Sequence, residues 1–505
     1  MNPESELKFR VEQGQLKSLA DMNIAGLRLG KAQDRHLTST YFDTPKQKLR
    51  RHGLTLRVRT MDDEFVQTVK TAAAGHAARG EWETKVKKPT PVFDHIAKTP
   101  LAPLATKKTR RKLAPIFETS VHRTTRPIHA GTSEIELAID RGNLRAGPRS
   151  EPIAEFELEL KKGEVADLFR VVRTLEDRTG AELYLRSKAE RGFRLTNGER
   201  QVAAHAEPIE LTAKMTAEEA FNVIAYSSLR HFSANADGIR ALDTEALHQM
   251  RVGLRRLRAA ISLFKGVLAE RETTGIKSEL KWLTGELARA REIDVFVKER
   301  IRPLEEDRIE PESGIRAIEE EFSEACDQAF RKAREALATE RYRRLLIDVL
   351  EWLERRRGNG QESKTPIGDF VNALMRRRTR KAIKAGRHLD DLTARERHKL
   401  RIGIKKIRYG VDFFESLYPR KAQATLQQFS KRLKKIQDAL GALNDFVAHQ
   451  GMAAKAALNA PREHRRARAF ASGLMVGQER EASKTLLAEA AKQIRHLRPL
   501  QAKPG

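Results

Sequence analysis

Hydrophobic and polar residues follow two different periods along the chain, and the period changes near residue 210. Before that point, apolar and polar positions alternate in short runs such as Leu54–Arg59, Phe65–Lys70 and Glu155–Leu160. Alternation of period two, interrupted by turn residues, predicts the strands of an antiparallel sheet. Helical patterns around 14–22 and 164–179 lie between these runs, so the first part of the chain is predicted to be α+β.

Beyond residue 210 the apolar positions recur at the helical period, and prolines become scarce. This pattern predicts an all-α bundle. Residues 207–210 (Glu-Pro-Ile-Glu) are the expected joint between the two parts, and 303–314 and 358–366 are expected loops. We therefore predict a first domain over residues 1–203 and a second over residues 212–498.

The second part contains an internal repeat with a spacing of 150 residues. The run His248–Arg258 (HQMRVGLRRLR) matches the run His398–Arg408 (HKLRIGIKKIR) position by position, and the match continues beyond it. Duplication of one helical unit explains this self-similarity. The two predicted copies cover about 212–357 and 367–498.

The chain has 505 residues, with 97 Lys and Arg against 69 Asp and Glu, and its formal net charge is +28. A chain of this length exceeds what one hydrophobic core supports, so two or more domains are expected. The positive excess favours polyanionic partners, namely nucleic acid, an anionic membrane surface or a phosphate polymer. The single cysteine excludes an intrachain disulfide and a cysteine-based zinc cluster.

The sequence carries no sign of a membrane or secretory segment. Its apolar runs stay well below the ~18 residues that a membrane helix needs. The charged N-terminus, MNPESELKFRVEQ, has no apolar core of the kind found in signal peptides. We therefore expect a cytoplasmic protein without a membrane partner.

Charged side chains occupy one face of several predicted strands, because successive side chains of a strand point to opposite sides. A solvated, salt-bridged face explains any one such strand. Acidic pairs on some strands and basic pairs on others favour instead a phosphate ligand bound together with a divalent metal. A closed sheet would turn this face into a tunnel. The charged positions are Glu4, Glu6, Lys8, Arg57, Arg59, Glu134, Glu136, Asp140, Glu155, Glu157 and Glu159.

Residues 4–8, Glu-Ser-Glu-Leu-Lys, are similar to the ExExK signature of the CYTH domains, also called triphosphate tunnel metalloenzymes. The resemblance covers roughly residues 1–200. It implies an N-terminal eight-stranded antiparallel β tunnel with flanking helices, which binds triphosphate together with Mg²⁺ or Mn²⁺. Further matches, in the family's order, are Thr40–Pro45, Leu56–Arg59, Lys70, Arg123, Ile135–Asp140, Glu157–Glu159 and Ser187–Lys188.

The resemblance also implies roles for individual residues of this sequence. The implied metal ligands are Glu4, Glu6, Glu136, Asp140, Glu157 and Glu159. The implied phosphate-binding residues are Lys8, Arg57, Arg59, Lys70, Arg123 and Lys188. The implied catalytic set is Glu4, Glu6, Lys8, Arg57, Arg59 and Lys70. Glu155 is a third carboxylate beside the 157–159 pair, and the alternating Glu81, Glu83 and Lys85 have no assigned role.

Each copy of the repeat predicts an amphipathic helix with an apolar face and a basic face that bears a histidine. A solvated bundle surface explains one such helix. Two basic faces with few acidic neighbours favour a groove that binds a polyanion. Metal ligation by the histidines is disfavoured, because no acidic or cysteine partner sits at ligand spacing.

This part of the chain resembles the CHAD domain, the conserved histidine α-helical domain, over about residues 212–498. The two His-x-x-Arg helices described above carry the resemblance. It implies a C-terminal duplicated four-helix-bundle domain whose basic surface binds inorganic polyphosphate, and it suggests a location at polyphosphate granules. The implied polyphosphate-binding residues are His248, Arg251, Arg255, Arg256, Arg258, His398, Arg401, Lys405, Lys406 and Arg408.

The sequence thus predicts a Mg²⁺- or Mn²⁺-dependent triphosphatase that converts inorganic triphosphate to diphosphate and phosphate, attached to a polyphosphate-binding module. One alternative is a non-catalytic polyphosphate-binding or targeting protein, and another is an enzyme that processes nucleoside triphosphates. A charged tunnel without an aromatic cluster offers little to a nucleobase. Six tyrosines and three tryptophans, none interleaved with the basic stripes, argue against a nucleic-acid partner.

Overall fold

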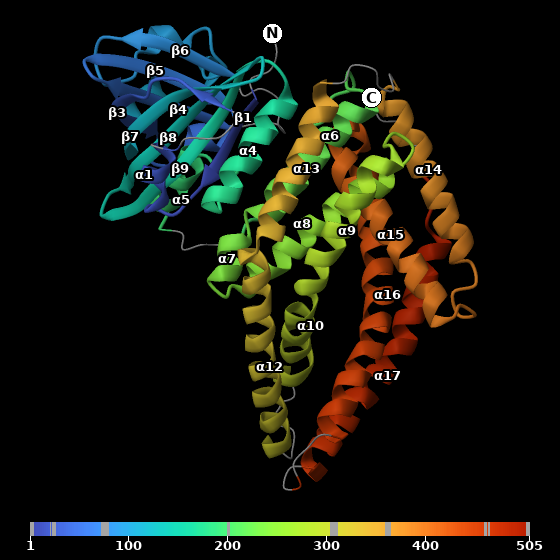
Figure 1. The fold of residues 1–505 in the computed structure, drawn as a ribbon. Helices are drawn as coiled ribbons and strands as arrows, with labels where there is room; N and C mark the ends of the chain where they lie inside the picture. The colour runs from blue at the N-terminus through green and yellow to red at the C-terminus, as the bar shows by residue number, and fades with distance from the viewer. Residues whose placement is uncertain are drawn as a thin grey trace. The chain divides into compact units, whose positions relative to one another are not determined.

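The computed structural model of the chain forms two compact units (Figure 1). The first comprises residues 1–204, 229–237 and 338–359, and the second comprises 205–228, 238–337 and 360–505. No helix in the described part of the chain is long and apolar enough to cross a membrane. The structure describes residues 5–20, 27–71, 80–198, 203–303, 312–358, 365–458 and 465–500, together with Met22 and Arg462.

One large sheet forms the body of the first unit, and its strands run from blue to teal in Figure 1. The strand order is β10-β1-β9-β8-β7-β3-β4-β5-β6, β2 pairs with β7, and neighbouring strands are antiparallel. The strands are β1 Ser5–Arg10, β2 Arg28–Leu29, β3 Gln33–Asp43, β4 Leu54–Met61, β5 Glu64–Thr71, β6 Glu81–Val86, β7 Ala114–Ala130, β8 Ser133–Ala146, β9 Arg149–Lys162 and β10 Glu182–Leu183.

The antiparallel sheet confirms the predicted α+β architecture, but the prediction of a closed eight-stranded tunnel is wrong. The sheet has ten strands, and among the strands that the structure describes no pairing joins β6 to β1 or β10. Strands β2 and β10 contain two residues each, too few for an alternating pattern to reveal. Closure depends on pairing between strands distant in sequence, which the alternation within one strand does not encode.

The two faces of the sheet differ in polarity, as the alternation predicts. Leu7 and Phe9 of β1, and Phe156 and Leu158 of β9, are buried on one face. The predicted helices are confirmed as α1 (Gln15–Ala20) and α4 (Val165–Thr179), and α4 contacts β7, β8 and β9. Shorter helical segments of this unit are α2 Lys48–Arg51, η1 Phe93–Ile96, η2 Ala102–Leu104, α3 Lys107–Lys112 and α5 Lys188–Thr196.

Helix α13 (Glu340–Gly358) belongs to the first unit, although it follows α12 far along the chain. It packs against α4 through ion pairs. Arg173 Nη1 lies 2.8 Å from Asp348, and Arg343 Nε lies 2.6 Å from Glu176. Helix α13 therefore lies beyond residue 210, where the sequence has the helical period, yet it contacts α4 in the part before residue 210.

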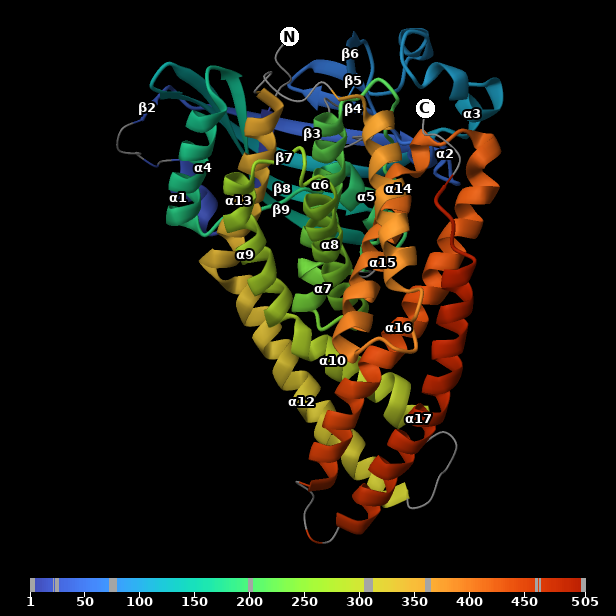
Figure 2. The ribbon, with the colours of Figure 1, turned by 90° about the vertical axis from the view of Figure 1, so that its right-hand side faces the viewer.

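The secondary-structure elements that the structure describes in the second unit are helices, apart from an isolated bridge between Thr216 and Pro366, which confirms the all-α prediction. Figure 2 shows α16 and α17 side by side as a long pair. The expected loops at 303–314 and 358–366 fall mostly outside the described residues, and residues 312–314 already belong to α12. The remaining elements are α6 Ala217–Ser233, α7 Ala236–Arg240, α8 Thr244–Leu263, α9 Glu270–Glu286, α10 Ala288–Phe296, η3 Val297–Ile301, α12 Glu312–Ala338, α14 Ile367–Ala385, α15 Ala394–Phe414, η4 Glu415–Leu417, η5 Arg420–Ala422, α16 Gln423–Leu458 and α17 Arg465–Arg495.

The two copies of the repeat lie on α8 and α15, which pack against each other. Phe264 and Phe414 occupy equivalent positions in the two copies, and their ring centroids are 5.9 Å apart. The Arg256 guanidinium lies 5.0 Å from the centroid of the Phe413 ring. Contact between equivalent residues is what twofold packing produces near its axis. The duplication seen in the sequence is therefore also a packing relationship.

Candidate active site

Three carboxylates form a row across adjacent strands on the charged face of the sheet. Glu6 on β1 lies opposite Glu159 on β9, and Glu159 lies opposite Glu136 on β8. Lys161 Nζ lies 2.7 Å from Glu159 and 3.6 Å from Glu136. Partial desolvation and the Glu157 carboxylate raise the pKa of Glu6. Like charges directly opposite each other on a sheet repel, so a cation placed at this row would be stabilised.

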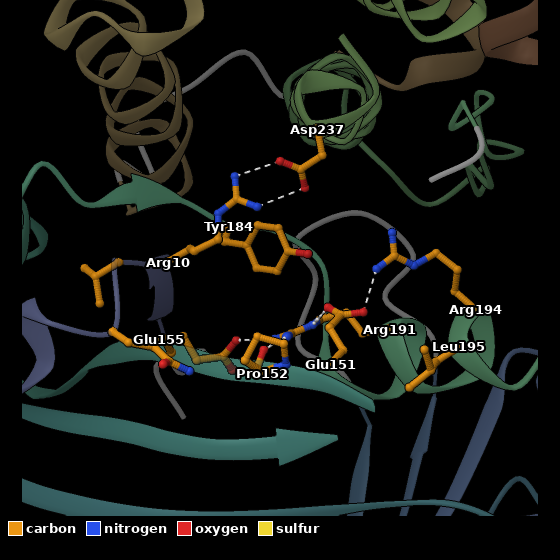
Figure 3. A pocket seen from close by; sticks show the side chains of 12 residues that line it. Arg10, Glu151, Pro152, Glu155, Tyr184, Arg191, Arg194, Leu195 and Asp237 are labelled. Carbon is orange, nitrogen blue, oxygen red and sulfur yellow. Dashed lines mark hydrogen bonds and ion pairs between the residues drawn. The ribbon is translucent and has the colours of Figure 1, made fainter. Parts of the chain in front are cut away.

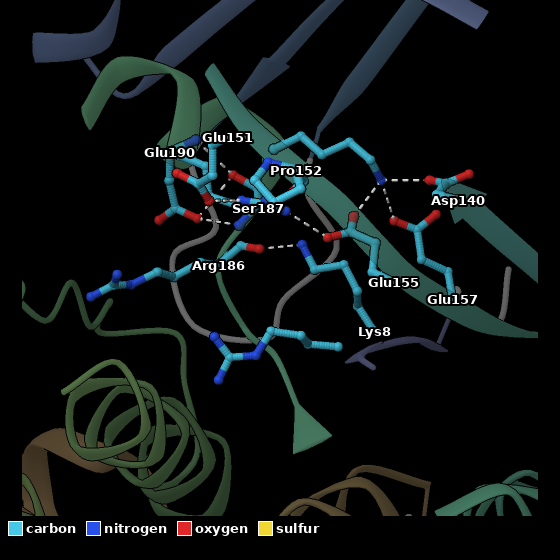
Figure 4. A network of polar contacts seen from close by, with 12 residues as sticks. Lys8, Asp140, Glu151, Pro152, Glu155, Glu157, Arg186, Ser187 and Glu190 are labelled. Atoms are coloured by element: carbon cyan, nitrogen blue, oxygen red, sulfur yellow. Dashed lines mark hydrogen bonds and ion pairs between the residues drawn. The ribbon is translucent and has the colours of Figure 1, made fainter. Parts of the chain in front are cut away.

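A second group of carboxylates, Asp140, Glu155 and Glu157, has ligand oxygens within 4.8 Å of one another. Figure 4 labels these three carboxylates. Lys188 Nζ approaches all three of them, at distances between 2.5 and 3.1 Å. Arg123 donates two hydrogen bonds of 2.7 Å to Asp140 and one of 2.7 Å to Glu157. This group is therefore a network of ion pairs formed by the protein's own side chains.

The network determines the ionisation of its members. Burial alone would raise the pKa of Glu157, but Lys188 and Arg123 hold it far below its ordinary range. Burial opposes the charge of Lys188 as well, yet the surrounding carboxylates raise the pKa of its ammonium group. Because this cluster already has basic partners, a divalent metal has less to gain there than at the Glu6–Glu159–Glu136 row.

Strands β4 and β5 contribute basic side chains to the same face. Arg59 donates a hydrogen bond of 3.2 Å to Ser39, and burial together with Arg57 lowers the pKa of Arg59 to about 10. Lys70 Nζ lies 2.7 Å from Glu81, and Arg57 lies 3.5 Å from the same carboxylate. Burial, and then Arg57, lowers the pKa of Lys70. An anion that binds here would favour the charged forms of Arg59 and Lys70, which burial and Arg57 disfavour.

The sheet curls enough to bring distant strands into electrostatic range across this face. Lys70 on β5 acts on the carboxyl group of Glu6 on β1, although five strands lie between β1 and β5 in the sheet order. Lys8, on β1 opposite Glu157, donates a hydrogen bond to the carbonyl of Arg186, and burial lowers its pKa. Acidic and basic walls thus face one common space.

The structure places most of the predicted site residues on this one face, because cross-strand partners share a side of the sheet. Glu4 lies outside the described residues. The individual roles given to these residues remain predictions. The predicted residues that share the charged face are Glu6, Lys8, Arg57, Arg59, Lys70, Arg123, Glu136, Asp140, Glu157 and Glu159, and Lys188 reaches them from α5.

Three side chains that the sequence analysis left without a role belong to the same site. Glu155 is a member of the ion-pair network, and Lys161 neutralises part of the carboxylate row. Arg191 pairs with Glu155 at 2.9 Å and with Glu151 at 2.7 Å. Lys161 follows Glu155 at an even spacing on the same strand, and Arg191 lies three residues after Lys188 on α5. Both spacings place the side chains on one face, so the sequence pattern could have predicted both residues.

A cavity of about 450 Å³ adjoins the network at Glu155 (Figure 3). Its arginines are paired with carboxylates: Arg10 with Asp237 at 2.9 Å, and Arg194 with Glu151 at 2.8 Å. The Arg10 guanidinium also lies 4.9 Å from the centroid of the Tyr184 ring. These pairings make the cavity close to neutral, unlike a phosphate-binding cradle.

In the second unit, the first basic helix face gathers cations from α8 and α10. Burial and Arg291 lower the pKa of His248. Burial and Arg255 lower the pKa of Arg251 to about 10, and Arg251 also donates a hydrogen bond of 3.2 Å to the carbonyl of Thr284. Side chains of like charge lie together at the predicted position.

The second basic face gathers cations from α8, α14 and α15. Burial, and then Arg378 and Arg258, lowers the pKa of Lys406. Arg256 has different surroundings, since it lies over Phe413 and interacts with Asp412. The structure thus brings Arg258 and Lys406 together, whereas Arg256 takes part in the packing of α8 on α15.

Two domain families match the chain. Residues 2–193 match the CYTH domain, and residues 224–454 match the CHAD domain. The chain therefore carries a CYTH domain followed by a CHAD domain, as the sequence motifs predicted.

Within the CYTH region, a segment of 168 residues is 35% identical to an inorganic triphosphatase of Haemophilus influenzae. The aligned segment is 32% of this chain and 47% of that enzyme, so the chain spans about half of this relative's length. An uncharacterised protein of Mycobacterium tuberculosis is 24% identical over 474 residues, 88% of this chain and 86% of that one. The crystal structure of the CHAD domain from the plant Ricinus communis superposes with a TM-score of 0.52 at 27% identity, over 60% of this chain and 99% of that one.

Proposed function

We propose that the protein hydrolyses inorganic triphosphate to diphosphate and phosphate on the charged face of the sheet. The observation that carries the proposal is the Glu6–Glu159–Glu136 row facing the basic side chains Arg57 and Lys70. The inorganic triphosphatase of Haemophilus influenzae supports the same reaction through its similarity to the CYTH region.

The donor set of the row fits a hard divalent cation, since its ligands are carboxylate oxygens. Glu6, Glu136 and Glu159 would hold Mg²⁺ or Mn²⁺. When bound, such an ion supplies positive charge that orients water and offsets the charge of phosphate oxygens. The repulsion among the three carboxylates gives the row a reason to bind a cation that the paired cluster around Lys188 lacks.

The chain's own basic residues bind and orient the substrate. Arg57, Arg59 and Lys70 donate charge-assisted hydrogen bonds to the nonbridging oxygens of the triphosphate. Water attacks the terminal phosphorus, the bond to the bridging oxygen breaks, and diphosphate leaves with the electron pair. Fixed positive charge beside that oxygen stabilises the charge that develops on it. Lys8 and Lys188 hold the substrate from the side of β1 and α5.

We further propose that the CHAD domain, over about residues 212–498, binds inorganic polyphosphate. The support is the two cation groups around His248 and Lys406, in which burial and then neighbouring arginines lower the pKa of these two side chains. A polyanion relieves this repulsion and releases bound counterions. The CYTH domain would then span residues 1–203, and the protein would act in the cytoplasm in association with polyphosphate granules.

Phosphate release by the purified full chain tests the proposal. We expect Mg²⁺- or Mn²⁺-dependent turnover of inorganic triphosphate in preference to ATP and to long polyphosphate, and we expect Glu6→Gln to abolish it. Preference for ATP would favour a nucleotide-processing enzyme instead. Absence of turnover with polyphosphate still bound would favour a non-catalytic binding protein.

A further inference from the structure

The loop between β10 and α5 brings Lys188 to the carboxylate network, and a capping box fixes where α5 begins. The Oγ of Ser187 accepts a hydrogen bond of 3.2 Å from the backbone nitrogen of Glu190. In return, Glu190 Oε2 accepts a hydrogen bond of 2.6 Å from the backbone nitrogen of Ser187. Lys188 is the first residue of the helix, so the geometry of this cap sets the direction of its side chain.

Arg230, near the end of α6, binds the other carboxylate oxygen of the same cap. Its Nη2 pairs with Glu190 Oε1, and its Nη1 donates a hydrogen bond of 3.2 Å to the carbonyl of Leu185. Burial alone would raise the pKa of Glu190, but Arg230 and Ser187 lower it to about 2. The guanidinium therefore joins the start of the loop to the cap at its end through charge-assisted hydrogen bonds.

Three further contacts hold the same region. Arg186 Nη2 donates a hydrogen bond of 2.6 Å to the carbonyl of Ala234, and the carbonyl of Arg186 accepts one from Lys8 (Figure 4). Arg10, two residues after Lys8 on β1, pairs with Asp237 (Figure 3). Residues 229–237 belong to the first unit through such contacts, although they lie within the range that matches the CHAD domain.

We propose that Arg230 is a positioning residue for the triphosphate site. It acts through Glu190, holding the first turn of α5 so that the Lys188 ammonium reaches the carboxylate network and the bound phosphates. The inference rests on the proposed triphosphatase function. It has one specific consequence: a residue outside the matched CYTH range of 2–193 sets the efficiency of the CYTH site.

Steady-state kinetics of the full chain test the role of Arg230. Arg230→Ala is expected to lower kcat/KM for triphosphate about 10- to 100-fold, the order of loss that a misplaced binding group causes. Most of the change should be in KM, because Lys188 contacts the substrate before the reaction as well as during it. Arg230→Lys should restore part of the loss, since lysine keeps the charge but not the second hydrogen bond.

Glu190→Gln, alone and combined with Arg230→Ala, tests whether Arg230 acts through Glu190. Because the two side chains act as one pair, the double variant should lose no more than the worse single variant. Arg173→Ala is the matched control: it breaks the ion pairs of α4 with Asp348 and Glu351 in the same unit without touching the loop, and it should behave as the wild type.

Amide hydrogen exchange of residues 184–190 gives a readout that does not need turnover. Exchange should be faster in Arg230→Ala than in the wild type or in Arg173→Ala. Unchanged exchange, or additive kinetic effects of the two substitutions, would overturn the inference. If Arg230→Ala does not fold, Arg230→Lys and Glu190→Gln carry the same comparison. A wild-type protein without turnover would reject the proposed function, and the exchange result would still decide whether Arg230 holds the loop.

Discussion

Glu6 and Glu159 lie directly opposite each other on the antiparallel strands β1 and β9, and Glu136 extends the row onto β8. In the neighbouring network, by contrast, Lys188 reaches every carboxylate. The two acidic groups therefore differ in how their negative charge is compensated. The network is stabilised from within by lysine and arginine side chains, whereas the row gains from a cation supplied from outside.

The first prediction concerns the stability of the row. Glu6→Gln removes one of three repelling carboxylates, so in metal-free buffer the variant should be more stable than the wild type by about 0.2–1 kcal/mol. Added Mg²⁺ or Mn²⁺ should raise the Tm of the wild type. At a metal concentration of 100 times Kd, the free energy of unfolding should increase by about 2.7 kcal/mol. The variant should lose most of this response while its turnover falls about 100-fold or more.

Thermal unfolding with and without metal measures these effects. Glu64→Gln is the matched control, because Glu64 is an exposed carboxylate of the same sheet that pairs with Lys85. It should keep the metal response of the wild type. An equal rise in Tm on metal addition in Glu6→Gln and in the wild type would refute the assignment of the metal to this row.

The second prediction concerns the ion-pair network. Lys188→Met leaves Asp140 and Glu155 without their shared ammonium group, and removing one partner of a buried ion pair costs about 3–5 kcal/mol. Lys161→Met breaks the half-exposed pairs of Lys161 with Glu159 and Glu136, and should cost about 0–1 kcal/mol. Urea unfolding followed by circular dichroism measures both losses. Equal losses would contradict the distinction between the paired network and the row.

The third prediction concerns the pH dependence of turnover. The pKa of Glu6 is raised above 4.5, so its carboxylate protonates at a higher pH than an ordinary glutamate, and turnover should fall as pH decreases through that value. The pKa values of Lys8 and Lys70 are lowered below 10.5, so their ammonium groups are lost earlier as pH increases. The profile of kcat/KM should therefore be bell-shaped, with both limbs displaced toward neutrality.

Variants assign the limb on the alkaline side. Lys70→Arg should move that limb to higher pH, because the ordinary pKa of a guanidinium lies well above that of an ammonium group. A profile of Lys70→Arg that coincides with the wild type would show that Lys70 does not control the alkaline limb.

The fourth prediction concerns polyphosphate binding by the CHAD domain. Lys406→Ala relieves repulsion from Arg378 and Arg258, so the variant should be slightly more stable without ligand and should bind polyphosphate about tenfold more weakly. Calorimetric titration with polyphosphate of defined length, at two salt concentrations, measures the loss. Lys332→Ala, at an exposed position of α12 in the same unit, is the control and should bind as the wild type does. Equal affinities of the two variants would place the binding surface elsewhere.

Much of the fold and the site followed from local patterns. The runs beginning at Leu54, Phe65 and Glu155 lie within β4, β5 and β9, because period two is a direct consequence of strand geometry. The same geometry determines that Glu155, Glu157 and Glu159 share a face. The repeat likewise predicted two amphipathic helices, which are α8 and α15.

The open edge of the sheet, its two shortest strands and the contribution of α13 to the first unit could not be found in this way. Each depends on pairing or packing between segments far apart in the chain, and a local period holds no information about such partners. The different surroundings of Arg256 and Arg258 have the same origin, because Arg256 meets Phe413 only when α8 packs on α15.

The sequence by itself determined which side chains line the charged face, how the helical unit repeats, and that oxygen ligands and basic groups occur together. Only the tertiary structure determined which basic side chains lie beside which carboxylates. It placed Lys188 among Asp140, Glu155 and Glu157, left Glu6 beside Glu159, and brought Arg230 to the cap that precedes α5. The physical reason is that a side chain's place on its own strand is set by neighbours one or two residues away, whereas neutralisation depends on atoms that only long-range folding brings within a few ångströms.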